Sequence, residues 1–216
     1  MVARITVLAA AFLLVWAGTA AARVTPSIHE DEVVPPRVRE SSPPVAPGRP
    51  GTLKVVPGRS RSSAPGALRF LVEVEGGLSV DRAAFARQVT RTLRDRRSWT
   101  TPFQRVGSGP VDFRVTLASP SLTDRLCAPL LTNGIYSCAQ DGRAVLNSMR
   151  WREGARAYGN RLDRYRIYMV NHEVGHLLGR GHASCAAPGA RAPVMMQQTK
   201  GVAPCRPQPW PLSWER

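Results

Sequence analysis

Four stretches of the chain have strand-like patterns of apolar and polar residues, and these stretches predict the strands of a β-sheet. Leu68–Glu75 is rich in β-branched and aromatic residues, and Val111–Leu117 alternates along its length. Two further strand-like runs, 134–139 and 144–149, flank Asp141-Gly142. Because Asp-Gly fits the tight turn of a two-residue hairpin, these two runs are expected to pair in antiparallel fashion.

Two other stretches have apolar positions at the three- and four-residue spacing that is typical of a helix. The first runs from Ser79, a good N-cap, to about Arg97. The second runs from about Arg161 to Leu178, with Asn160 as its N-cap. The order strand, helix, strand, hairpin, long helix and irregular tail predicts an α+β fold.

The N-terminal part of the chain differs in composition from the rest. Arg4 precedes the apolar run Ile5–Ala22, which ends in small residues, as a secretory signal peptide does. The run is also close to the shortest membrane span, roughly 17 residues, so a retained membrane anchor is the alternative. Residues 23–66 are rich in Pro, Ser and Arg and predict a disordered linker, with an inhibitory propeptide acting through Glu30-Asp31-Glu32 as the open alternative. The globular domain is then expected to span residues 67–216.

The second predicted helix ends in the motif H-E-x-x-H-x-x-G-x-x-H, residues 172–182. Residues four apart share a helix face, so His172 and His176 can present two imidazoles to one metal ion. Glu173 lies beside this pair, where a carboxylate can accept a proton from a water that the metal activates. Paired histidines on a helix are often only surface residues, but three of the chain's 4 histidines lie in this motif. The motif therefore predicts a metal site.

Gly179 and His182 complete the predicted site. Because it lacks a Cβ, Gly179 can adopt the positive φ that ends a helix, and the resulting turn returns His182 as a third nitrogen ligand. Three imidazoles and one open position form a catalytic Zn²⁺ site. The chain downstream of the motif has no Asp, and its other candidate ligands are Glu215, Cys185 and Cys205. A cysteine ligand would produce a closed, structural site instead.

The 4 cysteines of the chain predict two disulfides if the protein is exported. Three pairings are possible, and closeness in the sequence favours Cys127–Cys138 and Cys185–Cys205. The second disulfide would enclose Met195 and Met196. Closing a loop of this size stabilises a fold by roughly 3 kcal/mol when the gain comes from chain entropy.

The motif resembles that of the metzincin clan of zinc endopeptidases, since Pro193-Val194-Met195-Met196 follows it as a methionine turn does in that clan. The chain also resembles, more narrowly, a metzincin-like domain family of secreted or anchored actinobacterial proteins whose biological role is unassigned. The residues that carry this narrower resemblance are Asn171–His176, Ala192–Thr199, Cys205 and Pro209-Trp210-Pro211.

The resemblance implies a twisted mixed sheet of four to five strands above a long zinc-binding helix, then the methionine turn and a short irregular C-terminal tail. Met195 would lie beneath the metal, with Met196 as the alternative. Residues 134–139 would form an antiparallel edge strand that aligns an extended peptide by β-augmentation. Some metzincins have a tyrosine two residues after the methionine, and here that position is Gln197.

The residues and the resemblance together predict a secreted or envelope-tethered zinc metalloendopeptidase. His172, His176 and His182 would hold one Zn²⁺, and Glu173 would act as general base. Two alternatives stay open: a non-catalytic, zinc-stabilised module that binds the cell envelope, and a zinc amidase that acts on cell-wall peptides. The presence of Glu173 favours catalysis, because a purely structural site needs no base.

Charge narrows the set of expected partners. The chain carries 30 Lys and Arg against 15 Asp and Glu, a formal net charge of +15. A basic exported domain attracts acidic substrates and anionic envelope polymers. Nucleic acid is not expected, because the chain has no motif that binds it. The expected partners are therefore a peptide or protein substrate and envelope polymers, with membrane contact only through an N-terminal anchor and the chain as a monomer.

Overall fold

The structure is a computed structural model that describes residues 49–61 and 64–216. These residues lie in one compact unit of the chain, residues 41–216. The predicted signal peptide, residues 1–22, and most of the predicted linker lie outside the described residues. No helix in the described part of the chain has the length and apolar character needed to cross a membrane.

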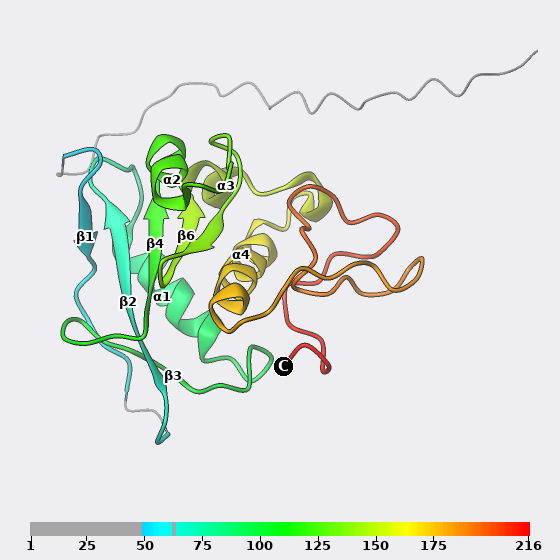
Figure 1. The fold of residues 1–216 in the computed structure, drawn as a ribbon, viewed down its shortest axis with the longest axis horizontal. Helices are drawn as coiled ribbons and strands as arrows, with labels where there is room; N and C mark the ends of the chain where they lie inside the picture. Colours follow the sequence, from blue (N-terminus) through cyan, green and yellow to red (C-terminus); the bar gives the residue numbers. More distant parts are fainter. Residues whose placement is uncertain (1–48, 62–63) are drawn as a thin grey trace, which may run out of the picture. The chain divides into compact units, whose positions relative to one another are not determined.

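The described residues form one mixed, 6-stranded sheet (Figure 1). Its strands are β1 (Leu53–Val55), β2 (Leu68–Glu75), β3 (Phe103–Arg105), β4 (Phe113–Ala118), β5 (Cys138–Gln140) and β6 (Arg143–Asn147). The strand order is β1-β2-β4-β6-β5, and β3 pairs with β2 outside this path. The strands β2, β3, β4 and β6 run parallel, whereas β1 and β5 are antiparallel to their neighbours.

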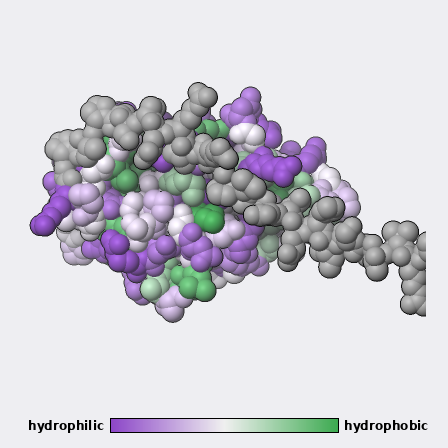
Figure 2. All heavy atoms as spheres, turned by 90° about the horizontal axis from the view of Figure 1, so that it is seen from above, coloured by the Kyte–Doolittle hydropathy of each residue, from purple (hydrophilic) through white to green (hydrophobic). Residues whose placement is uncertain are grey.

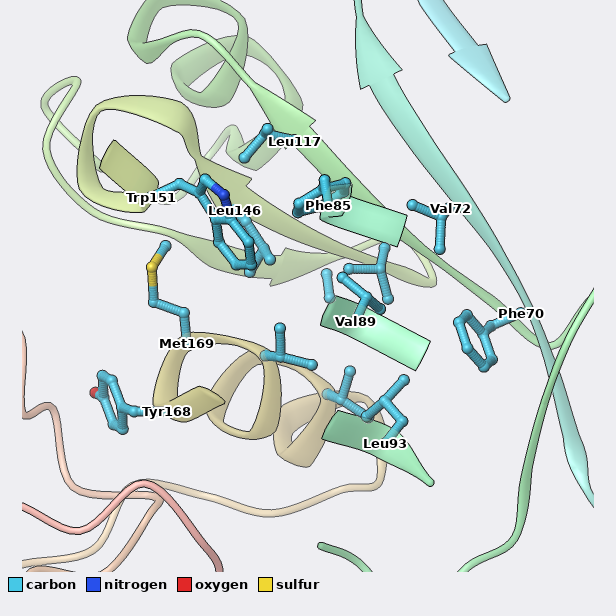
Figure 3. Close-up of a cluster of buried hydrophobic side chains, with 14 of the residues drawn as sticks. Phe70, Val72, Phe85, Val89, Leu93, Leu117, Leu146, Trp151, Tyr168 and Met169 are labelled. Carbon is cyan, nitrogen blue, oxygen red and sulfur yellow. The ribbon is translucent and has the colours of Figure 1, made fainter. Parts of the chain in front are cut away.

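Four α-helices accompany the sheet in the described residues. They are α1 (Arg82–Leu93), α2 (Pro120–Cys127), α3 (Ser148–Glu153) and α4 (Leu162–Leu177), with a 3₁₀ turn at Arg156–Tyr158. Helices α1 and α4 pack on one face of the sheet, and their apolar side chains meet those of the central strands (Figure 3). Successive strand residues point to opposite faces. Leu146 therefore joins this main core, while its neighbour Val145 packs with Leu122 of α2 on the other face.

The strand predictions with strong periodicity are confirmed. Strand β2 has the predicted bounds, and β4 covers most of the second predicted strand. The hairpin is present as β5 and β6, with Asp141 and Gly142 both at positive φ, 49° and 67°. Two positive φ values are what a tight hairpin turn requires, and Asp and Gly accept them readily.

Both helix predictions are correct in position, and both name the wrong N-cap. The cap of α1 is Asp81 rather than Ser79, because the Asp81 carboxylate accepts from the backbone N of Ala84 at 2.9 Å. The same helix ends at Leu93 rather than near Arg97. Helix α4 follows the predicted span, but its N-cap is Arg161 rather than Asn160, with no side-chain cap hydrogen bond.

The sheet has six strands where four to five were expected, and the additional ones are short. Strands β1 and β3 have 3 residues each, too few to produce a periodic pattern. The predicted edge strand began at Gly134, but β5 begins only at Cys138. The preceding residues form a turn in which the backbone N atoms of Ile135 and Tyr136 both donate to the carbonyl of Thr132.

The folded domain begins before residue 67, so the predicted linker boundary at residue 66 is wrong. Strand β1 pairs with β2, and Val56, which directly follows β1, is buried in the core. The guanidinium of Arg105 donates to the carbonyl oxygens of Val56 and Pro57. The carboxylate of Glu75 accepts from the backbone N of Gly51 at 2.8 Å. These contacts tie residues 51–57 to the sheet.

Truncation tests this boundary. Removal of residues 1–66 should lower the free energy of unfolding by on the order of 3 kcal/mol relative to removal of residues 1–48, because it exposes the core under Val56 and leaves Arg105 without its acceptors. Urea unfolding of the two truncated chains measures the difference. Equal stability of the two would contradict the assignment of residues 51–57 to the folded domain.

Candidate metal centre

Helix α4 carries the first two predicted ligands on one face. His172 and His176 lie one turn apart, and their ring centroids are 4.8 Å from each other. His172 is buried, whereas His176 is half-buried. Their spacing is that of two ligands presented by a helix to one ion.

A backbone carbonyl orients each of these imidazoles. The Nδ1 of His172 lies 2.7 Å from the carbonyl oxygen of Val194, and the Nδ1 of His176 lies 2.8 Å from that of Arg180. A carbonyl oxygen can only accept, so Nδ1 carries the proton in both rings. Each Nε2 then presents its lone pair, which is the arrangement that surrounding hydrogen bonds impose on histidine ligands of metals.

The chain turns back after α4 and brings His182 to the pair. Gly179 has a φ of 80°, in the region that favours glycine. The Nε2 atoms of His182 and His176 are 3.1 Å apart, and the ligand atoms of all three histidines lie within 4.8 Å of one another. Ligands of one tetrahedral zinc ion, with Zn–N bonds of about 2.0–2.1 Å, are separated by about 3.4 Å. The three-histidine group could therefore hold a metal ion.

The three histidines are expected to be in the neutral form that binds a metal ion. Burial lowers the pKa of His172 to about 3. Burial also lowers the pKa values of His176 and His182. All three imidazoles are therefore neutral at neutral pH, which is the form that binds metal ions.

Glu173 is a buried carboxyl group beside the histidines. Its side chain is only 6% exposed, and no described residue gives it a hydrogen bond or an ion pair. Burial raises the pKa of Glu173 to about 8. An unpaired buried carboxylate is unfavourable unless a cation lies near it. The donor set and this carboxylate thus both fit a bound cation at the histidines.

Met195 packs against α4 at Gly175, next to His176 in the sequence. It is 2% exposed, and a Cβ at Gly175 would lie 2.4 Å from its sulfur and 2.6 Å from Cζ2 of Trp99. Only glycine therefore lets the methionine and the indole approach the helix between His172 and His176. Met196 is partly exposed, and its carbonyl accepts from the hydroxyl of Tyr168 at 3.0 Å.

Glu215 is a site residue whose role the sequence did not indicate. Its buried carboxylate accepts from the backbone N atoms of Val194 and Met195, both at 2.9 Å, and from that of Leu212 at 2.7 Å. It therefore holds the backbone of Val194 and Met195, and it does not belong to the three-histidine group. The one available signal was that Glu215 is the only acidic residue downstream of the motif.

Two buried amides hold the irregular segment that follows α4. Asn171 accepts from the hydroxyl of Ser98 at 2.8 Å and donates to the carbonyl of Pro209 at 2.9 Å. Gln198 donates to the carbonyl of Pro193 at 2.9 Å and accepts from the hydroxyl of Tyr158 at 2.9 Å. Each amide bonds on both of its polar atoms, so the irregular segment is held in one position.

Both predicted disulfides are present. Cys127–Cys138 joins the end of α2 to the start of β5, and Cys185–Cys205 closes the loop that contains Met195. No described cysteine is free. Two disulfides indicate an oxidising, extracellular environment.

A cleft of about 290 Å³ opens beside the histidines. It is lined by Leu130, Leu131, Thr132, Tyr136, Ser137, Cys138, Ala139, His172, Glu173, His176, His182, Gln197 and Lys200. Two of these residues belong to the edge strand β5, and five precede it in the loop from α2. Leu131 in this loop is 87% exposed. On the face drawn in Figure 2, hydrophobic residues that are not covered by grey atoms form small separate groups among hydrophilic ones.

The described fold and site define a mixed α/β domain with a three-histidine group that could hold a metal ion. The chain belongs to a family described as protein of unknown function (DUF3152), whose sequence profile matches residues 42–208. The match includes β1, in agreement with a domain that begins before residue 67. No curated protein and no solved structure matched the chain.

Substitution of Gly175 by alanine tests the close contact under the site. The new Cβ would overlap Met195 and Trp99. We expect a loss of about 1–3 kcal/mol in the free energy of unfolding and weaker metal binding, because displacing the segment removes the acceptor of the His172 Nδ1–H. Thermal unfolding and titration with Zn²⁺ measure the two effects.

Gly181→Ala is the matched control, since a Cβ added at Gly181 would have no neighbouring atom within 4 Å. It should change stability by no more than about 0.5 kcal/mol. If Gly175→Ala and Gly181→Ala had the same stability and Zn²⁺ affinity, the contact would not support the site.

Proposed function

We propose that this protein is a secreted or envelope-tethered, zinc-dependent endopeptidase similar to the metzincins. The observation that carries the proposal is the convergence of three histidine side chains next to the unpaired carboxyl group of Glu173, in a cleft bordered by a sheet edge. His172, His176 and His182 would hold the zinc ion.

A zinc ion bound there supplies Lewis acidity, which lowers the pKa of water and polarises a peptide carbonyl. Glu173 accepts a proton from the attacking water, whose oxygen forms a bond to the carbonyl carbon. As the C–N bond breaks, Glu173 delivers that proton to the leaving nitrogen. Its buried position and raised pKa suit a group that must both accept and return a proton near neutral pH.

The edge strand supports a peptide as the substrate. In the described residues β5 pairs only with β6, so its other edge is free of strand partners. Cys138 and Ala139 of this strand line the cleft that holds the histidines. An extended peptide that pairs with this edge would pass the candidate metal centre, as β-augmentation requires.

The contacts of residues 193–196 with helix α4 support the likeness to metzincins. Met195 packs against Gly175 of α4, and the carbonyl of Val194 faces Nδ1 of His172, contacts that a methionine turn beneath the ligands would make. The two disulfides agree with an exported protein.

Substitution of Glu173 by glutamine tests the assigned base. Glutamine has nearly the same shape but cannot accept the proton, so hydrolysis should fall by about 10²-fold or more. The ligands are unchanged, so bound zinc should stay at one ion per chain. Metal analysis and digestion of an unstructured protein measure the two quantities, with Glu153→Gln, outside the cleft lining, as the control.

The same assay separates the alternative functions when peptidoglycan is included as a substrate. Chelator-sensitive cleavage of peptidoglycan alone would indicate a zinc amidase. Bound zinc without cleavage of either substrate would indicate a binding module. Activity of Glu173→Gln equal to that of the unchanged protein would contradict the role of Glu173.

A further inference from the structure

The cleft beside the histidines contains one positive charge without an acidic partner. Among the residues that line it, Lys200 is the only lysine or arginine, and Glu173 is the only acid. Glu173 is buried, whereas Lys200 is exposed. The ion pairs of the described residues do not include Lys200. Its ammonium group is therefore available to a ligand in the cleft.

Neighbouring side chains hold this ammonium group without neutralising it. The Nζ atom lies 5.2 Å from the centroid of the Tyr136 ring and 3.4 Å from the Oε1 of Gln197. Tyr136 belongs to the loop before β5, and Gln197 follows Met195. The loop before β5 and the segment after Met195, which both line the cleft, thus meet at Lys200. An aromatic face and an amide oxygen orient a cation, but neither carries a negative charge.

We propose that Lys200 selects substrates by binding a carboxylate of the peptide close to the bond that is cleaved. The inference rests on the proposed function, since it names the substrate class of the same cleft. A side chain of Asp or Glu and a free C-terminus both supply this group. The ammonium group lies in the same cleft as the histidines. Its charge therefore acts on the part of the substrate next to the cleaved bond, whereas the net charge of the chain acts on the whole substrate.

The basic surface offers a competing explanation for any preference for acidic peptides. With a net charge of +15, the whole chain attracts anions. The general attraction of the basic surface and the local effect of Lys200 can be separated with a control at Lys54. Lys54 is the only other lysine of the chain, and it is exposed on β1, a strand that does not line the cleft. Lys54→Glu changes the net charge by the same amount as Lys200→Glu and leaves the cleft intact.

The test compares kcat/KM for peptides that differ only in Glu against Gln next to the cleaved bond, and for peptides with a free against an amidated C-terminus. The unchanged protein should favour the carboxylate in at least one pair by about 10-fold or more, which is the size expected for one partly exposed ion pair in a cleft. The pair of peptides whose kcat/KM values differ shows whether a side chain or the C-terminus supplies the carboxylate. Lys200→Glu should abolish or reverse the preference, and Lys54→Glu should retain it.

Binding supplies a second readout that does not depend on turnover. The Kd values of the same peptides for the zinc-loaded Glu173→Gln variant should show the preference for the carboxylate. The double variant Glu173→Gln, Lys200→Glu should lack this preference. A preference in binding without hydrolysis by the unchanged protein would reject the peptidase and retain the role of Lys200. If Lys200→Glu and Lys54→Glu showed the same preference for the carboxylate, in hydrolysis or in binding, the role of Lys200 would be overturned. The absence of binding to any of the peptides would overturn it as well.

Discussion

The contact between residues 193–196 and helix α4 is the interaction on which the candidate site depends. The carbonyl of Val194 accepts the Nδ1–H of His172, and Met195 fills the space that Gly175 leaves open. Both interactions are buried, so packing orients the first histidine before any metal binds. A ligand fixed in this way loses little freedom when the ion arrives, which favours binding.

Parts of the chain far from the histidines stabilise this contact. The segment after α4 contains no helix or strand in the described residues, only an isolated bridge between Arg191 and Arg206. Its backbone groups bond partly to one another in turns and partly to side chains, above all to the carboxylate of Glu215, which accepts from Val194 and Met195. The Cys185–Cys205 disulfide closes the same segment. The site is therefore built by the tertiary fold around a helix that supplies only two of its ligands.

The features that could be predicted from the sequence are those with a local cause. Eight residues rich in β-branched and aromatic side chains indicated β2, and the turn residues Asp141 and Gly142 indicated the hairpin. The motif spacing indicated that His182 returns to the helix. The rest depends on contacts distant in the sequence. Strand β1 exists because it pairs with β2 and is anchored by Glu75, and no pattern in its 3 residues reveals this. The role of Glu215 likewise arises only once the chain is folded.

The most direct test of the site is the coordination of zinc in the protein with both disulfides intact. X-ray absorption at the zinc edge, together with metal analysis, reports the number of ions and the type of ligand atom. The predicted result is one zinc ion per chain, bound by three imidazole nitrogens and no sulfur, and loss of the ion in His182→Ala. A sulfur ligand, or a protein that binds no zinc, would contradict the three-histidine centre.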